Sequence, residues 1–367
     1  MNWSKVELND VLEKIVGGGT PSKSISDYWN GDIPWCSVKD MVGDKYQLYS
    51  TEDTITNSGL ENSSSNLIPS GTVITSTRMG LGRAFINKVD MAINQDLKAL
   101  IPNERIDNKF LLWTIVNKSE EIEGLGIGST VKGIRLEVLK GLKFNLPPLL
   151  TQRKIASILS AYDDLIENNL KRIILLEEKA RIEYILIQKN KKIEFKKAHE
   201  VLQFSTGKLN SNAAVENGLY PFFTCGQEIL RTNTFSLDEE VVLLGGNNAN
   251  AIYPVFYYNG KFDAYQRTYI IKPKPEVYIS FKYLYFFWES KLDYLRNIST
   301  GAATKFLTLK ILNDIDLPMP SKKVMEEYET LTEPIFKLKA VLTDQNTKLR
   351  EARDILLPKL MNGQIEV

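Results

Sequence analysis

The sequence has few of the side chains on which metal sites and many catalytic sites depend. Among its 367 residues there are one histidine, His199, and two cysteines, Cys36 and Cys225. These are too few for a Cys/His zinc site or for a disulfide framework. No apolar run approaches the roughly 18 residues that span a bilayer, and the first residues lack the apolar segment of a signal peptide. We therefore expect a cytoplasmic protein without a metal site.

The chain also lacks an excess of either charge. Lys and Arg together number 46 and Asp and Glu 45, which gives a formal net charge of +1. A strongly basic chain, the simplest sign of nucleic-acid binding, is therefore excluded. The charge is uneven, because 151–197 is basic and the segments on either side of it are not. The length predicts two or three domains.

Two segments have apolar residues spaced alternately by four and three positions, from 155 to 187 and from 324 to 356. Such spacing over about five heptads is typical of a coiled coil. Asn169 and Gln345 are polar positions in these seams and could fix the register of the helices. Pro334 could kink the second helix. Two such helices can pair within the chain or with a second copy of it, and at this point both alternatives stay open.

The two helical segments belong to a longer internal repeat. Residues 128–147 align without gaps with 301–320 at an offset of 173, and 108–115 align with 281–288 at the same offset. Further upstream, Gln95 and Gln266 occupy similar places. Because a repeat determines the architecture, we predict a globular domain followed by a long helix, twice in the chain.

Each globular part is predicted to be α+β. Alternating apolar residues indicate strands at 71–78 and 83–86 in the first part, and at 240–246 and 253–258 in the second. Short helices are expected near 109–122 and 281–296.

Motifs for catalysis are missing from the sequence. There is no G-x-x-x-x-G-K-[ST] segment for binding nucleotide phosphates, and the glycines at 17–19 and 124–128 lack the spacing of a dinucleotide site. An adenine methyltransferase would carry an Asn/Asp-Pro-Pro-aromatic tetrad. The nearest segment, 145–148, has Leu146 between the asparagine and the prolines, and we interpret it as the start of a helix.

Two polar loops remain as candidates for recognition. Residues 76–83 place Arg78 and Arg83 on a glycine-rich connection between strands, where arginine can reach a phosphate or a base edge. Residues 245–250 hold the equivalent place in the second part and offer asparagines, which suit adenine. Loops of this composition also occur for conformational reasons alone, and both explanations stay open.

Four segments of the sequence carry a family resemblance. They are WSKVELNDVLEKIVGGGTPS (3–22), YWNGDIPW (28–35), LPPLLTQRKIASILSAYDDLIE (146–167) and LREARDILLPKLMNGQI (349–365). Together with the repeat, they closely resemble the DNA specificity subunit of type I restriction-modification systems, and the likeness covers nearly the whole chain.

The resemblance implies a non-catalytic subunit. It implies two α/β target recognition domains, at 1–148 and 198–320, each reading half of a split double-stranded DNA site. Two long antiparallel coiled-coil helices, at 149–197 and 321–367, would space them in a pseudo-twofold arrangement. The expected partners are two modification subunits, which bind S-adenosylmethionine and methylate adenine, and restriction subunits, which use ATP and Mg. No cofactor is expected in this chain.

The expected DNA contacts follow from side-chain chemistry and repeat position. In the first domain they are base contacts by Arg78, Arg83, Asn94 and Gln95, and in the second by Asn247, Asn248, Asn250, Gln266 and Arg267. Lys132 and Lys305, which precede the long helices, are candidate phosphate contacts. Further candidates in the early polar loops are Thr20, Ser22, Lys23, Lys208 and Asn210.

Two other functions fit parts of the pattern. A coiled-coil scaffold or homodimeric adaptor accounts for the heptads and the neutral charge, and it predicts no salt-dependent DNA binding. A self-sufficient methyltransferase is disfavoured by the missing tetrad, and tight binding of S-adenosylmethionine by the isolated chain would revive it.

Overall fold

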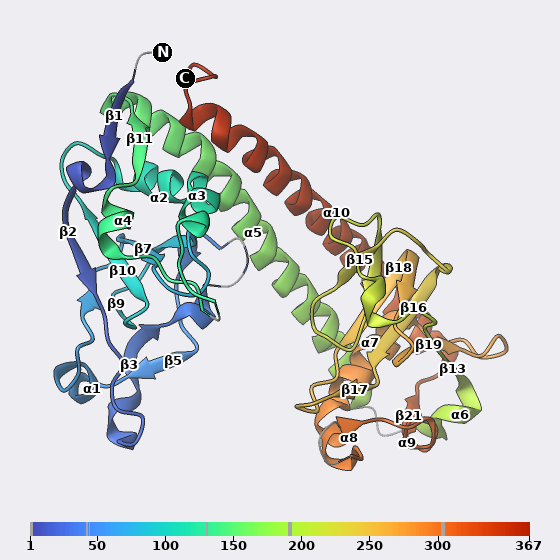
Figure 1. The fold of residues 1–367 in the computed structure, drawn as a ribbon. Helices are drawn as coiled ribbons and strands as arrows, with labels where there is room; N and C mark the ends of the chain where they lie inside the picture. Colours follow the sequence, from blue (N-terminus) through green and yellow to red (C-terminus); the bar gives the residue numbers. More distant parts are fainter. Residues whose placement is uncertain (1–2, 42, 44, 130, 190–192, 302–304) are drawn as a thin grey trace. The chain divides into compact units, whose positions relative to one another are not determined.

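The computed structural model describes residues 3–41, 43, 45–129, 131–189, 193–301 and 305–367. The chain divides into two compact units (Figure 1): unit one contains 1–170 and 344–367, and unit two contains 171–343. Two long helices, α5 (Leu149–Gln188) and α10 (Lys322–Met361), each contribute one part to either unit. The predicted α+β class, with a repeated globular part followed by a long helix, is confirmed.

The strands of unit one are β1 (Ser4–Glu7), β2 (Leu12–Gly17), β3 (Trp29–Cys36), β4 (Gln47–Leu48), β5 (Asp53–Ile55), β6 (Leu67–Ile68), β7 (Val73–Ser76), β8 (Ala84–Asn87), β9 (Met91–Ile93), β10 (Leu97–Pro102) and β11 (Lys143–Leu146). One sheet has the order β2-β10-β7-β8-β4 and another the order β5-β3-β9-β6. The pairs β4–β8 and β3–β9 are parallel, and the other pairs are antiparallel. Strands β1 and β11 form a separate ribbon.

The helices of unit one are α1 (Asn57–Glu61), α2 (Asn108–Asn117), α3 (Ser119–Gly124), α4 (Leu136–Lys140) and the first part of α5, with 3-10 turns at Leu8–Val11, Ser26–Tyr28 and Val38–Asp40. Asp107 caps α2, because its carboxylate accepts hydrogen bonds from two backbone N–H groups of the first turn. Helix α2 contacts β7 and β8, and its buried Trp113 reaches Ser160 on α5. The single helix predicted near 109–122 is therefore two helices, which meet at Lys118.

Unit two repeats this plan. Its strands are β12 (Glu194–Lys197), β13 (Leu202–Thr206), β14 (Tyr220–Phe223), β15 (Leu230–Thr232), β16 (Leu237–Gly245), β17 (Asn247–Asn248), β18 (Val255–Ala264), β19 (Thr268–Pro273), β20 (Lys305–Phe306) and β21 (Asp316–Met319). Its helices are α6 (Ala198–Val201), α7 (Phe281–Ser290), α8 (Leu292–Ile298), α9 (Leu309–Asn313) and parts of α5 and α10, with a 3-10 turn at Ser211–Ala213. The main sheet has the order β13-β19-β16-β18-β14-β15.

The repeat holds at the level of strand pairing. The β2-β10-β7 order of unit one corresponds to β13-β19-β16 in unit two, and the β1–β11 ribbon corresponds to β12–β21. The parallel pair β3–β9 corresponds to the parallel pair β14–β18. Helices α2 and α7 each pack on the sheet and begin at positions 173 apart. Equivalent loops can therefore be identified from backbone contacts.

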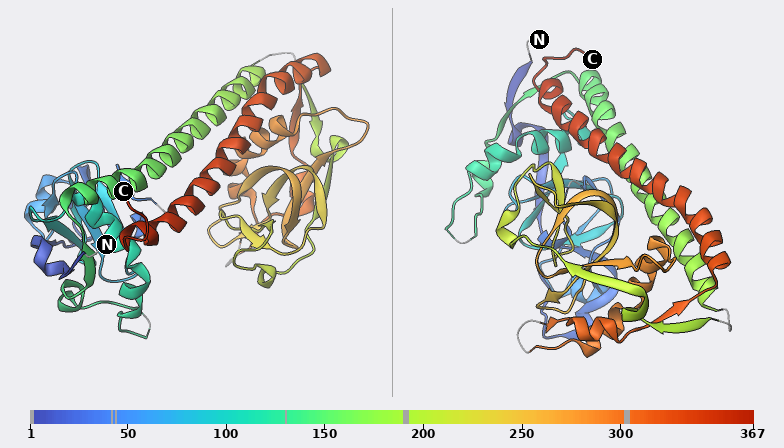
Figure 2. Two further views of the ribbon diagram at one scale, coloured as in Figure 1. Left: turned by 90° about the horizontal axis from the view of Figure 1, so that it is seen from above. Right: turned by 90° about the vertical axis from the view of Figure 1, so that its right-hand side faces the viewer.

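The long helices pair antiparallel within each unit, as both views of Figure 2 show. In unit one Asp163 on α5 bonds to Arg353 on α10 at 2.7 Å, and Asn169 donates to Asn346 at 3.0 Å. In unit two, an ion pair of 2.6 Å joins Glu177 and Lys339, and the Tyr328 hydroxyl donates to the carbonyl of Ala180. Residue numbers rise along α5 where they fall along α10.

The seam of α10 differs from the predicted one. Gln345 is exposed, and Asn346 is the amide that faces Asn169. Thr332 and Arg353 are buried, whereas the predicted seam residues Leu331 and Leu338 are 40% and 37% exposed. Hydrogen bonds to the Tyr328 carbonyl and to Asp163 compensate the burial of Thr332 and Arg353. A hydrophobic periodicity alone could not show these polar partners.

The long helices differ from expectation at the end of α5, at Pro334 in α10 and at the end of α10, which is Met361 and not the expected 367. Helix α5 ends at Gln188, before the expected 197, because residues 194–197 form β12 and pair with β21. Helix α10 continues through Pro334 without a break. The buried side chains that follow it, Ile335 and Phe336, pack in the core of unit two and hold the helix there.

Each unit attaches its long helices to the sheet by different side chains. In unit two, Lys282 of α7 is 1% exposed and its Nζ lies 2.5 Å from Glu329 and from Glu333 on α10, and 3.1 Å from Glu240 on β16. The equivalent residue of unit one, Lys109, is exposed. Unit one instead packs the guanidinium of Arg353 over the ring of Tyr46, with 4.7 Å between the guanidinium carbon and the ring centre.

Candidate nucleic-acid interface

The early polar loop of unit one docks on the turn before β10. Gly18 has no room for a Cβ, which would overlap the carbonyl of Ile93, so the loop can approach only with glycine at this position. The N–H of Gly19 donates to that carbonyl at 3.0 Å. Further along, the Thr20 hydroxyl donates to Oε1 of Gln95 at 2.6 Å. Two predicted contact residues, Thr20 and Gln95, are thus brought together.

The turn that carries Gln95 is built by its neighbours. Asn94 is 6% exposed, and its Oδ1 accepts a hydrogen bond from the N–H of Asp96. Below the turn, Lys98 donates to the carbonyls of Gln95 and Leu97, and burial lowers the pKa of its ammonium group. Asn94 therefore shapes the loop, and Gln95 is the side chain that reaches solvent.

Arg78 and Lys132 lie beside this turn. The N–H of Thr77 donates to the Asp96 carbonyl at 2.8 Å, and the N–H of Ile134 donates to the Thr77 carbonyl at 2.9 Å. The N–H of Met79 donates to the carbonyl of Lys132 at 3.2 Å. Arg78, Gln95 and Lys132 are all exposed. We call the assembled segments 18–23, 77–83, 94–96 and 131–134 loop cluster one.

The remaining candidates of loop cluster one differ in their freedom. Arg83 is exposed, but its Nη1 donates to the Met41 carbonyl at 2.8 Å. Ser22 pairs with Ser24 through their hydroxyls, and Lys23 is exposed. The guanidinium of Arg83 is thus held against the protein backbone.

Loop cluster two, formed by segments 207–210, 246–250, 265–267 and 305–307, repeats these backbone contacts in unit two. The N–H of Gly246 donates to the Arg267 carbonyl, and the N–H of Leu307 donates to the Gly246 carbonyl, both at 2.8 Å. A Cβ on Gly207 would overlap the Ala264 carbonyl, as at Gly18 in unit one.

The predicted side chains of unit two gather in loop cluster two. Strands β17 and β20 pair Asn248 with Lys305, and the N–H of Gln266 donates to the carbonyl of Leu209 between Lys208 and Asn210. Asn248 Oδ1 accepts from the N–H of Asn250 at 2.8 Å. The buried Oδ1 of Asn247 accepts no hydrogen bond from the part of the chain that the structure describes. Exposed side chains are Lys208, Asn210, Asn250, Gln266 and Arg267.

Three further residues of the clusters were not among the predicted ones. Met79 and Phe306 are 50% and 43% exposed beside Lys132 and Lys305. Asp96 is the counterpart of Arg267, since their carbonyls accept the equivalent hydrogen bonds. The repeat contained a signal for Asp96, because Asp96 and Arg267 each follow a glutamine, and these glutamines, Gln95 and Gln266, occupy similar places in the repeat.

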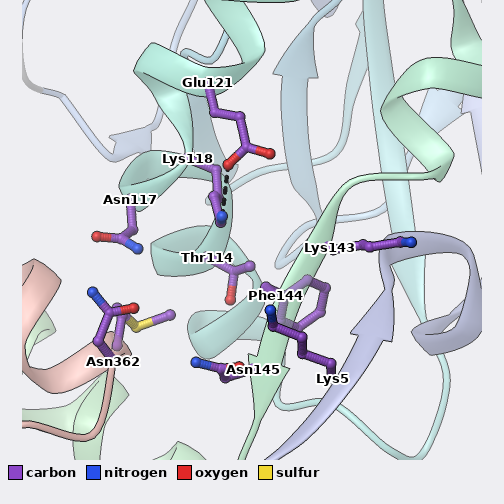
Figure 3. Close-up of a pocket in the computed structure, with 10 residues that line it drawn as sticks. Lys5, Thr114, Asn117, Lys118, Glu121, Lys143, Phe144, Asn145 and Asn362 are labelled. Atoms are coloured by element: carbon purple, nitrogen blue, oxygen red, sulfur yellow. Dashed lines mark hydrogen bonds and ion pairs between the residues drawn. The ribbon is translucent and has the colours of Figure 1, made fainter.

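A separate polar pocket of about 380 Å³ lies in unit one between the β1–β11 ribbon, α2 and the end of α10 (Figure 3). Asn117, Asn145 and Asn362 line it, and Lys118 forms an ion pair with Glu121 at its rim. The lining contains no nucleophile paired with a base. The pocket shares no residue with loop cluster one.

Among the residues that the structure describes, no helix is both long enough and apolar enough to cross a membrane.

Comparisons with known proteins give a consistent result. The chain matches the family described as type I restriction modification DNA specificity domain over residues 1–178 and 190–332. It is 26% identical over 417 residues to the type I restriction enzyme MjaIX specificity subunit of Methanocaldococcus jannaschii, covering 100% of this chain and 94% of that protein. It is 36% identical over 179 residues to the EcoR124I/EcoR124II specificity subunit of Escherichia coli, covering 46% and 44%.

A solved structure agrees in fold. The S subunit of a type I restriction-modification system from M. genitalium aligns with a TM-score of 0.59 at 18% identity, covering 98% of this chain and 96% of that chain. At this identity the likeness concerns the fold.

Proposed function

Because this chain belongs to the type I restriction modification DNA specificity family, we propose that it reads a bipartite, asymmetric DNA site, with one half-site for each unit. The duplicated loop clusters carry this proposal. Each exposes an arginine and a glutamine beside a lysine on backbone held by the same hydrogen bonds. These side chains bond to base edges and phosphates. Because the clusters differ in sequence, the two half-sites differ.

The near-neutral net charge is compatible with DNA binding under this proposal. Affinity for DNA arises from cations near the phosphates rather than from the total charge. In unit one, Arg78 and Lys132 supply positive charge at loop cluster one, and in unit two, Arg267 and Lys305 do so at loop cluster two. Further positive charge would come from the modification subunits.

The long helices would set the spacing between the half-sites. Each is a single helix of 40 residues, and each contributes to both units. The hydrogen bond between Asn169 and Asn346 would fix their register in unit one. A helical rod cannot stretch as a loop can, so a change in helix length would change the preferred spacer.

The proposed partners are two modification subunits and the restriction subunits. The helices expose large apolar side chains, including Leu150 at 69% and Leu165 at 52% exposure in unit one, and Ile174 and Leu175 at 64% each in unit two. Exposed apolar patches on a helix are typical of protein interfaces. The chain itself would carry no catalytic residue. S-adenosylmethionine, ATP and Mg would be bound by the partners.

A selection experiment tests the function. The full chain, co-expressed with its modification subunit, is incubated with a random duplex library, and the bound or methylated molecules are sequenced. We expect two unlike half-sites at a fixed spacing, and binding that weakens steeply as salt rises. An unsplit motif, or no motif at any salt concentration, would contradict the proposal and favour a scaffold role.

A further inference from the structure

The backbone contacts of the two loop clusters identify equivalent positions residue by residue. Thr77 corresponds to Gly246, because the N–H of each donates to the carbonyl of the residue that follows the glutamine, Asp96 in unit one and Arg267 in unit two. Arg78 therefore corresponds to Asn247. In the same way Lys132 corresponds to Lys305, since each precedes the residue that pairs with position 78 or 247.

At these positions some residues are the same in both units and others are exchanged. The glutamines Gln95 and Gln266 are the same, and so are the lysines Lys132 and Lys305. The arginine is different. In loop cluster one the arginine is Arg78, which follows Thr77, the donor of the shared N–H···O bond. In loop cluster two it is Arg267, whose carbonyl accepts that bond. Each cluster thus has one arginine at this shared backbone contact, Arg78 on its donor side and Arg267 on its acceptor side.

Both arginines are available for bonding. Arg78 and Arg267 are exposed, and in the described residues neither guanidinium donates a hydrogen bond or forms an ion pair. A guanidinium offers five N–H donors in a planar fork. Arg83 differs, since its guanidinium is bonded to the Met41 carbonyl.

We infer that the place of this arginine decides where each half-site carries its guanine. Arg78 would read a guanine in the half-site of unit one, and Arg267 would read a guanine at a shifted position in the half-site of unit two. The bidentate bond from arginine to O6 and N7 of guanine makes this the natural base. The shared lysines would bond to phosphate and carry no base preference. This inference rests on the proposed DNA-reading function and assigns its specificity to two residues.

The shared glutamines would have a more limited part. Oε1 of Gln95 already accepts a hydrogen bond from the Thr20 hydroxyl, so its amide N–H donors are the groups left to bond to DNA. Donors of this kind suit N7 of adenine and guanine and also O4 of thymine, whereas cytosine offers only a donor. Gln95 would therefore disfavour cytosine, and the arginine would select guanine.

The first test uses single variants of the full chain with its modification subunit. The probe is the duplex selected by the wild type, together with every single-base substitution of it. Arg78→Ala should abolish roughly ten- to a hundredfold discrimination at one guanine of one half-site and leave the other half-site unchanged. Arg267→Ala should do the same in the other half-site. Lys132→Ala is the matched control, and it should weaken all duplexes equally and lower the salt slope by about one.

A second variant moves the arginine. Arg78→Asn combined with Asp96→Arg gives loop cluster one the arrangement of loop cluster two, and the preferred guanine of that half-site should shift to a new position. If Arg78→Ala weakened every duplex equally, or if the double variant kept the original guanine position, the inference would be wrong while the proposed function still held. If the wild type selected no split motif, the proposed function would fail instead.

Discussion

Replacing Lys282 with methionine should destabilise unit two strongly. The ammonium group is surrounded by Glu240, Glu329 and Glu333 at 2.5 to 3.1 Å, and the lysine side chain is 2% exposed. Burial alone would lower its pKa, but hydrogen bonds to Glu329 and Glu333 raise the pKa well above the ordinary value, so the group is charged whenever the protein is folded. Removing one partner of a buried ion pair costs roughly 3 to 5 kcal/mol.

The expected cost lies at the lower end of this range. The three carboxylates are 28% to 37% exposed, so water can solvate them once the lysine is gone. We therefore expect Lys282→Met to lower the free energy of unfolding by roughly 3 kcal/mol. Because Lys282 is charged from pH 6 to pH 8, the loss should be the same at both.

Urea unfolding followed by circular dichroism measures this change, and the repeat supplies the control. Lys109 is the equivalent residue of unit one and is exposed, so Lys109→Met should change stability by no more than about 0.5 kcal/mol. A loss below about 1 kcal/mol for Lys282→Met, or equal losses for the two variants, would refute the idea that the ionic cluster holds α10 to the sheet.

Three further predictions concern other parts of the chain. Asn169→Leu should change the preferred spacer or broaden it in the selection experiment, whereas Gln345→Leu, at an exposed position, should leave it unchanged. The thiol of Cys36 is fully buried and burial raises its pKa, so iodoacetamide at pH 8 should label Cys225 alone in the native protein and both cysteines in urea; equal labelling of the native pair would contradict this. Burial favours the neutral form of Glu177, but its contacts with Lys339 and Tyr285 outweigh this and lower the pKa below its usual 4.5. Glu177→Gln should therefore cost about 1.5 kcal/mol at pH 7. That cost should disappear as the pH falls below 4.5 and the carboxylate is protonated; a cost independent of pH would exclude the ionic contribution.

The repeat made most of the architecture predictable from sequence. The offset of 173 between 128–147 and 301–320 correctly indicated two similar units, and the four-three spacing correctly indicated two long helices. The seam of α10 was predicted one residue off at several positions. Leu331 and Gln345 fit the four-three spacing, but the buried residues are their neighbours Thr332 and Asn346. The partners that allow Arg353 and Asn346 to be buried lie on α5, far away in the sequence.

The candidate interface was predictable as a set of loops, but the roles of its side chains were not. Composition selected Asn94 and Arg83 together with Gln95 and Arg78. The side chain of Asn94 already accepts a hydrogen bond from the backbone N–H of Asp96, and the side chain of Arg83 donates one to the carbonyl of Met41. No periodicity in the sequence indicates such local hydrogen bonds. Whether each selected residue contacts DNA stays a prediction.

The division of the chain into units has a consequence for the order in which it folds during synthesis. Unit two is a continuous stretch, 171–343, so all of its residues are synthesised before 344–367 is made. Unit one, although it begins first, receives Arg353, Leu357 and Leu360 only from that late segment. Domains complete their folding when all of their residues are available. Unit one, which begins before unit two, is therefore completed after it, and a stop codon near position 343 would remove part of unit one and leave the residues of unit two intact.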